Sequence, residues 1–238
     1  LRSRPGGGTF HIEDVQDQVE LGLMRGSHHE VARAYVLYRE RRTQERAKQG
    51  VAARAAKPHA INVIDNGQRV PLDEARLTTI IESACAGLGA DVKAEPILAE
   101  TRRNLYDGVP LDEVYKAAIL ASRTLIEQEP AYTRATARLL LHTIRKEILG
   151  QEVMQADMPA RYAEYFPKFI KKGVQAELLD EKLMQFDLAK LGQALNAERD
   201  MQFDYLGLQT LFDRYFLHID EQRIEMPQAF FMRVAMGL

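Results

Sequence analysis

One short stretch departs from the helical pattern of the rest of the chain and limits what the chain can fold into. It covers residues 61–72 and reads INVIDNGQRVPL. β-Branched residues flank Asn66-Gly67, a dipeptide that is the strongest short signal for a β-hairpin. A two-stranded ribbon is only marginally stable alone. The sequence therefore predicts a hairpin that packs against other elements, which must be helices.

The remaining segments have helical periodicity, with apolar residues three, four and seven positions apart. Prolines and glycines mark several ends, such as Pro130 before one helix and Gly150 after it. The predicted helical segments are 11–25, 26–42, 74–89, 93–108 with a break at Pro96, 110–128 and 130–150, followed by shorter pieces within 158–238. Outside the hairpin, only residues near Gln222-Arg223 suggest a strand. The predicted fold class is mainly α.

Two parts of the chain resemble each other at an offset of about a hundred residues, which indicates a duplicated small domain. The matching residues are Glu13-Asp14-Val15 with Asp112-Glu113-Val114, and Ala32-Arg33 with Ala137-Arg138. This repeat predicts four regions. They are residues 1–45 as the C-terminal half of a first copy, 46–60 as a linker, 61–151 as a complete second copy, and 152–238 as the start of a further helical domain.

The last predicted helix, within residues 227–238, is apolar on most of its surface. Such a helix needs burial nearly all round. We expect the aromatic-rich segment 205–217 to cover part of it, and chain beyond Leu238 to cover the rest.

Composition excludes several classes of function. The chain has 32 Lys and Arg against 34 Asp and Glu, for a net charge of −2. This balance argues against a protein that coats nucleic acid, which would need a basic excess. The single cysteine, Cys85, cannot form an internal disulfide, a thiolate zinc site or a dithiol pair, and it favours the reducing cytosol. No apolar run approaches the length of a membrane span.

Few side chains suggest chemistry by themselves. No phosphate-binding glycine loop is present, and no metal site or catalytic residue is expected. Cys85 is interpreted as a buried structural thiol, and His142 as a satisfied core or interface histidine. Arg145-Lys146 could bind a phosphate, but they lie in the last turn of a predicted helix, where a solvated basic cap is the alternative.

Longer segments resemble a known family. Residues 61–77 through 139–150 look like an ATP-cone, a hairpin over four helices that binds ATP or dATP as an allosteric signal, and residues 12–42 look like the C-terminal half of another. ERDMQFDYLGLQTLFDRYFL at 198–217 and QRIEMPQAFFMRVAMGL at 222–238 are similar to the start of the large subunit of class I ribonucleotide reductase.

The resemblance implies a cytoplasmic ribonucleoside-diphosphate reductase. It implies ATP and dATP as effectors, a small radical-generating metal subunit as partner, self-association through the cones, and no membrane or nucleic-acid partner. The family's catalytic barrel lies beyond the segment matched here, and Cys85 matches none of its catalytic cysteines. We therefore expect this chain alone to be inactive.

The second cone departs from the family pattern. Where relatives carry a Lys-Arg pair on the hairpin, this chain has Val63-Ile64-Asp65-Asn66, and Asp65 would repel a triphosphate. At two further positions, where the family carries polar residues, this chain has Leu111 and Tyr115, which are poor ligands for phosphate or ribose. Only Arg145-Lys146 is kept as a candidate nucleotide-binding pair. The prediction is a degenerate second cone, with the first cone as the sensor.

Two other classes of function stay open at this stage. A stand-alone nucleotide-sensing regulator would carry an ATP-cone, but that class has a paired-cysteine zinc ribbon, and no Cys-x-x-Cys occurs here. A non-enzymatic helical interaction module is the second alternative. Within the enzyme class, a cobalamin-dependent reductase is an alternative to the metal-subunit type.

Overall fold

A computed structural model describes Gly26, residues 61–65 and residues 67–238. The chain divides into two units, residues 1–59 and 60–238. The structure described below belongs to the second unit. Apart from Gly26, the helices predicted at 11–25 and 26–42, the linker and the first domain copy lie outside the described residues.

The predicted hairpin is present. Strand β1 (Asn62–Asp65) pairs antiparallel with β2 (Gln68–Pro71), and Asp65 lies opposite Gln68. Gly67 has a φ of +77°, a conformation that glycine adopts without steric cost. A short strand that the sequence analysis missed, β3 (Val109–Pro110), pairs in parallel with the other edge of β1. Two residues carry no periodicity, so only the long-range pairing reveals β3.

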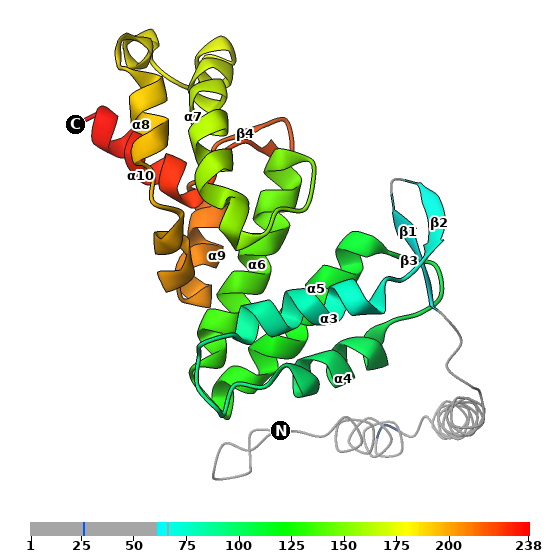
Figure 1. Ribbon diagram of the computed structural model, residues 1–238. Helices are drawn as coiled ribbons and strands as arrows, with labels where there is room; N and C mark the ends of the chain where they lie inside the picture. Colours follow the sequence, from blue (N-terminus) through cyan, green and yellow to red (C-terminus); the bar gives the residue numbers. More distant parts are fainter. Residues whose placement is uncertain (1–25, 27–60, 66) are drawn as a thin grey trace. The chain divides into compact units, whose positions relative to one another are not determined.

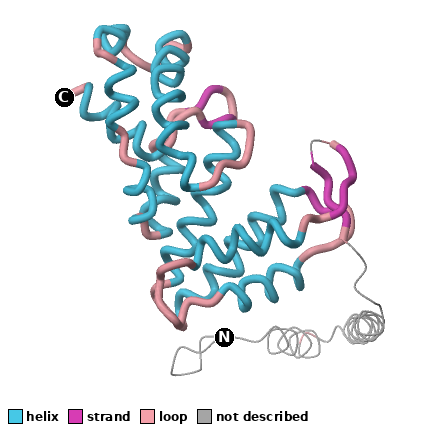
Figure 2. Tube along the Cα trace, viewed as in Figure 1, coloured by secondary structure: helices cyan, strands magenta, loops and turns pink. Residues whose placement is uncertain are grey.

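Four helices follow the hairpin and carry it at one end (Figures 1 and 2). They are α3 (Glu74–Cys85), α4 (Ala94–Asn104), α5 (Leu111–Thr124) and α6 (Tyr132–Leu149), with a 3-10 turn η1 (Leu125–Glu127) after α5. Asp73 caps α3, since its Oδ1 accepts from Arg76 N at 2.9 Å. Gly150 ends α6 in the left-handed region. The expected break at Pro96 is wrong, because this proline lies in the first turn of α4, where no N–H is needed.

The hairpin and the four helices share one core. Val63 of β1 packs there with residues that are fully or almost fully buried on the helices, including Ile81, Ile97, Val114, Leu141 and Ile144. Burial of aliphatic side chains of this size contributes about 1.5–3 kcal/mol each. The core explains why a ribbon too small to be stable alone is held in place.

The second half of the described chain consists of shorter elements, as expected. The helices are α7 (Met158–Gln175), α8 (Leu188–Ala194), α9 (Tyr205–Arg214) and α10 (Pro227–Met236). The 3-10 turns are η2 (Gln155–Asp157), η3 (Glu181–Gln185) and η4 (Ala197–Gln202), and a small ribbon joins β4 (His218–Ile219) to β5 (Gln222–Arg223). The strand suggested at Gln222-Arg223 is confirmed.

Side-chain caps divide this half into its short pieces. Asp180, Asp187 and Asn196 each accept a hydrogen bond from a backbone N–H two or three residues later. Such caps start a new turn rather than continue the preceding one. A second core forms around α7, and its fully buried side chains include Met158, Tyr162, Phe166, Phe169 and Ile170.

The helix α10 is anchored at its first turn and more exposed beyond it. Pro227, Gln228 and Ala229 are buried, and Phe230 packs edge-on or tilted against Tyr215 and Phe216. The expected contact with the 205–217 segment is therefore confirmed. Phe231 and Val234 keep 48% and 41% of their surface exposed, so burial all round is not reached among the described residues.

Close packing of α7 against α8 depends on one glycine. A Cβ placed on Gly192 would lie 2.9 Å from the carbonyl oxygen of Ala163, a backbone atom that cannot move aside alone. We expect Gly192→Ala to lower the free energy of unfolding by about 1–3 kcal/mol, as overpacked sites do. Urea unfolding of the full chain would measure it.

Gly207 of α9 provides the matched control, because a Cβ there meets no atom within 4 Å. Gly207→Ala should instead be neutral or stabilise the chain by up to about 1 kcal/mol, since alanine is the better helix former. Equal effects of the two substitutions would contradict the steric explanation.

Candidate functional site

Two adjoining pockets lie beneath the hairpin, with volumes of about 460 and 710 Å³. Both are lined by Asp65 of β1, Leu111 and Tyr115 of α5, Lys146 of α6, and Gly150. The hairpin supplies one wall because its core residue Val63 holds β1 against the helices. Leu111, Tyr115 and Lys146, singled out from the sequence, thus converge on one place.

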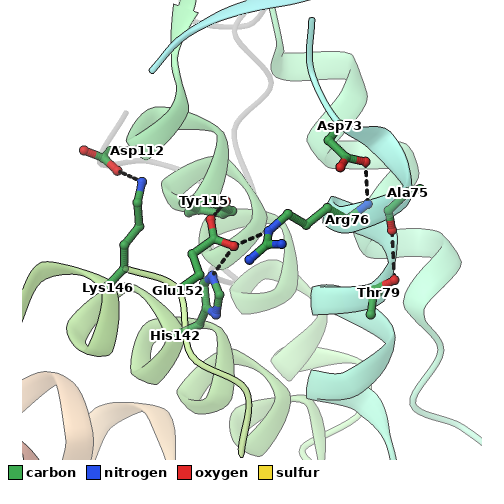
Figure 3. Close-up of polar contacts among 9 residues, drawn as sticks. All are labelled: Asp73, Ala75, Arg76, Thr79, Asp112, Tyr115, His142, Lys146 and Glu152. Carbon is green, nitrogen blue, oxygen red and sulfur yellow. Dashed lines mark hydrogen bonds and ion pairs between the residues drawn. The ribbon is translucent and has the colours of Figure 1, made fainter. Parts of the chain in front are cut away.

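A carboxylate that lines the smaller pocket is contacted by three other polar side chains. Glu152 follows the end of α6, and only 11% of its side chain is exposed. Its Oε1 accepts a hydrogen bond from the Tyr115 hydroxyl, and its Oε2 forms an ion pair with Arg76 Nε (Figure 3). His142 Nε2 lies 4.0 Å from the same Oε2. Three side chains, one each from α3, α5 and α6, therefore meet at Glu152.

Burial alone would raise the pKa of Glu152, but hydrogen bonds from Tyr115 and Arg76 lower it overall. Burial and the bond to Glu152 raise the pKa of Tyr115, so its hydroxyl stays protonated and donates. The result is an internal ion pair in which Glu152 already neutralises the cation of Arg76.

Lys146 is neutralised in the same way. Its Nζ lies 2.8 Å from Asp112 Oδ1 and 5.1 Å from the centre of the Tyr115 ring. Around the two pockets, acidic side chains outnumber basic ones five to three. They are Asp65, Asp73, Asp112, Glu147 and Glu152 against Arg76, Lys116 and Lys146. This lining disfavours a polyanion.

The predicted pair Arg145-Lys146 is split by the structure. Lys146 faces the pockets beneath the hairpin, whereas Arg145 is 5% exposed and forms a 2.9 Å ion pair with Asp200 of η4. The alternative of a solvated basic cap is wrong for Arg145, because the helix end is covered by the second half of the described chain. The nucleotide-binding role of the pair stays a prediction.

Sequence reasoning missed Arg76 and Glu152 as site residues. They lie 76 positions apart, and no local motif connects an exposed helical arginine to a glutamate after a helix end. Only the packing of α3 beside α6 brings them together.

The structural interpretation of Cys85 is confirmed. It is 7% exposed, and burial raises the pKa of its thiol to about 11, so it is not a reactive thiolate. Only 11% of the His142 side chain is exposed, but its Nε2 has no hydrogen-bond partner, so the expectation of a satisfied histidine is wrong for that atom. Within the described ranges, no group of three or more His, Cys, Asp or Glu could hold a metal.

Acid should destabilise the chain through His142. Burial lowers its pKa below the ordinary value, and Arg76, Arg145 and Lys146 lower it further, against the opposing effect of Glu152. The His142 imidazole therefore takes up a proton more readily in the unfolded chain than in the folded chain. As a result, the free energy of unfolding falls as the pH drops below about 6.5.

Urea unfolding between neutral pH and about pH 5, above the ordinary pKa of glutamate, would measure this effect. His142→Gln is expected to remove part of the slope, which for one proton is at most about 1.4 kcal/mol per pH unit. An unchanged slope in that variant would show that His142 is not responsible.

Comparison with known proteins adds the family context. Residues 2–44 match the family described as ATP cone domain, and residues 201–238 match the family described as ribonucleotide reductase, all-alpha domain. In the structure, the second match covers part of η4, α9 and α10. The two matches agree with the resemblance found in the sequence for residues 12–42 and 198–238.

Curated relatives share most of this chain. The ribonucleoside-diphosphate reductase subunit alpha of Chlamydia trachomatis is 36% identical over 231 residues, which cover 95% of this chain and 22% of the relative. That of Chlamydia pneumoniae is 33% identical over 237 residues, or 98% of this chain and 23% of the relative. That of Helicobacter pylori is 30% identical over 73% of this chain. The chain spans between a fifth and a quarter of the length of these relatives.

Proposed function

This chain is homologous to the alpha subunits of ribonucleoside-diphosphate reductase, and from that premise we propose that it is the N-terminal regulatory and helical part of such an enzyme. The observation that carries the proposal is the similarity over 95% of the chain, together with the matches to an ATP cone and to the reductase all-alpha domain. The full-length protein would reduce ribonucleoside diphosphates. The barrel with its catalytic cysteines would lie outside this chain.

The regulatory part of the proposal is allosteric. ATP or dATP bound at the first cone, residues 1–45 here, would change how the cones associate and so shift the population between active and inhibited oligomers. The active enzyme would also contain a small metal-bearing subunit and would work in the cytoplasm. Within the described residues, no helix is both long and apolar enough to cross a membrane.

The second cone, residues 61–151, is proposed to bind nucleotide weakly or not at all. A triphosphate needs unpaired cations and N–H donors. Beneath this hairpin, Arg76 is engaged by Glu152 and Lys146 by Asp112, while acidic side chains are in excess. A bound triphosphate would have to displace both internal carboxylates.

Calorimetric titration of the 238-residue chain with dATP tests this part. We expect Lys146→Gln to leave the affinity for dATP unchanged. The control, Lys168→Gln, removes an exposed lysine of α7 that is paired with Glu164, and it should also leave this affinity unchanged. A drop of about tenfold or more in Lys146→Gln alone would show that the second cone binds dATP.

Activity measurements test the enzyme assignment. The full-length protein mixed with its small metal subunit should reduce ribonucleoside diphosphates, whereas the 238-residue chain should not. Reduction that needs cobalamin instead of a small subunit would contradict the proposed partner.

A further inference from the structure

A third pocket, of about 220 Å³, lies between α3, α6, the segment from Val153 to Ala156, and Met201 of η4. Arg138, His142 and Arg145 line it from α6. Their spacing of four and three residues places them on one face of the helix. Ser83 of α3 also lines the pocket and is exposed.

Some polar atoms of the residues that line this pocket have no hydrogen-bond partner. Among the described residues, four buried side-chain atoms have no hydrogen-bond partner, and all four belong to residues that line it. They are Arg138 Nε, His142 Nε2, Arg145 Nε and Gln155 Oε1. Arg145 is 95% buried, being 5% exposed. Buried polar groups are normally paired, so this concentration points to a ligand with complementary groups.

The charged side chains that line the pocket, Arg138 and Arg145, are basic. None of its described lining residues is acidic. Asp200 is bonded to Arg145 Nη2, Tyr162 and Gln228, and Glu152 is bonded to Tyr115 and Arg76. Burial and the neighbouring Arg134 lower the pKa of Arg138, which reflects a cation without a countercharge nearby.

We propose that this pocket binds a phosphoryl oxyanion, either free phosphate or the phosphate of a larger molecule. Guanidinium N–H groups match phosphate oxygens in geometry and charge. A hydroxyl on a singly protonated phosphate could donate to Gln155 Oε1, an amide oxygen that accepts. One water occupies about 30 Å³ of liquid, so the pocket has room for a phosphate. The site is separate from the hairpin pockets and does not depend on the proposed function.

Thermal unfolding and calorimetry of the 238-residue chain test the proposal. Phosphate, compared with chloride at equal ionic strength, should raise Tm saturably in the millimolar range. Arg138→Gln should weaken phosphate binding by about tenfold or more. The control is Arg134→Gln, one turn earlier on α6. This variant loses the same charge, but from an exposed side chain outside the pocket, so it should bind phosphate as tightly as the unsubstituted chain.

A second variant covers the case in which Arg138→Gln folds poorly, since Arg138 Nη1 also donates to the carbonyls of Ala84 and Ala86. Ser83→Glu introduces a carboxylate at an exposed position of the pocket and should abolish the phosphate response while the helical circular dichroism is kept.

Parallel titrations with dATP distinguish free phosphate from the phosphate of a larger molecule as the ligand of this pocket. A response to phosphate that Ser83→Glu removes assigns the site to the free ion. A response to dATP alone that this variant removes assigns it to the phosphates of a nucleotide. The proposal would be overturned by no response to either ligand, by a phosphate response that survives in Ser83→Glu, or by equal losses in Arg134→Gln and Arg138→Gln. A dATP response that survives in Ser83→Glu, with no response to phosphate, would place dATP elsewhere and would also overturn it.

Discussion

Arg145→Met should lower the free energy of unfolding by about 3–5 kcal/mol, the range measured when one partner of a buried ion pair is removed. Arg145 is 5% exposed, and Asp200, its partner at 2.9 Å, is 1% exposed. Asp200 would keep its bonds to Tyr162 and Gln228 but lose its countercharge. Burial already raises the pKa of Asp200. In the Arg145→Met variant, the Asp200 carboxylate would therefore tend to take up a proton. Urea unfolding at neutral pH measures the change.

Two further variants make this prediction specific. The double variant Arg145→Met/Asp200→Asn should recover part of the loss, since a neutral amide can still bond to Tyr162 and Gln228 without a buried charge. Arg134→Met removes an exposed arginine of the same helix, 3.7 Å from Asp204, and should cost about 0–1 kcal/mol. A loss in Arg145→Met no larger than in Arg134→Met would contradict the prediction.

Phe166→Ala should cost about 3–5 kcal/mol, because it removes a fully buried ring and leaves a cavity in the second core. The ring lies 6.3 Å from that of Phe169, measured between centroids, and both come from α7. The neighbouring helices cannot close the gap easily, since α7 and α8 already meet at Gly192 with no spare room. Urea unfolding would measure the loss of stability.

Phe186 supplies the matched control for that substitution. It carries the same side chain in the same half of the chain but is 45% exposed. Phe186→Ala should therefore cost much less than Phe166→Ala. Similar costs would mean that burial in the second core is not what stabilises this half.

The interlocking of the two cores has a consequence for regulation. Arg145 belongs to the last turns of α6, whereas Asp200, Tyr162 and Gln228 come from η4, α7 and α10. One buried cluster thus ties the four-helix unit to the helices that follow. In the proposed enzyme, this unit could move independently of the following helices only by breaking the buried Arg145–Asp200 ion pair.

The fold was largely predictable because its signals are local. The pair Asn66-Gly67 predicted the hairpin, and Gly150 the end of α6. The missed features depend on distant contacts. Strand β3 exists only through its pairing with Val63 and Ile64, and the pocket residues Arg76 and Glu152 meet only in the folded chain.

The sequence by itself determined the helical class, the hairpin, the inert Cys85 and the relationship to the reductase large subunits, because periodicity, turn residues and similarity are properties of contiguous residues. Only the tertiary structure decided what the adjacent pair Arg145-Lys146 does. Neighbouring residues on a helix point about 100° apart, so each is surrounded by different elements. Lys146 faces Asp112 beneath the hairpin, and Arg145 faces Asp200 in the interior. The charge of each side chain follows from the sequence, but the residue with which it pairs is set by the packing of helices that are distant in sequence.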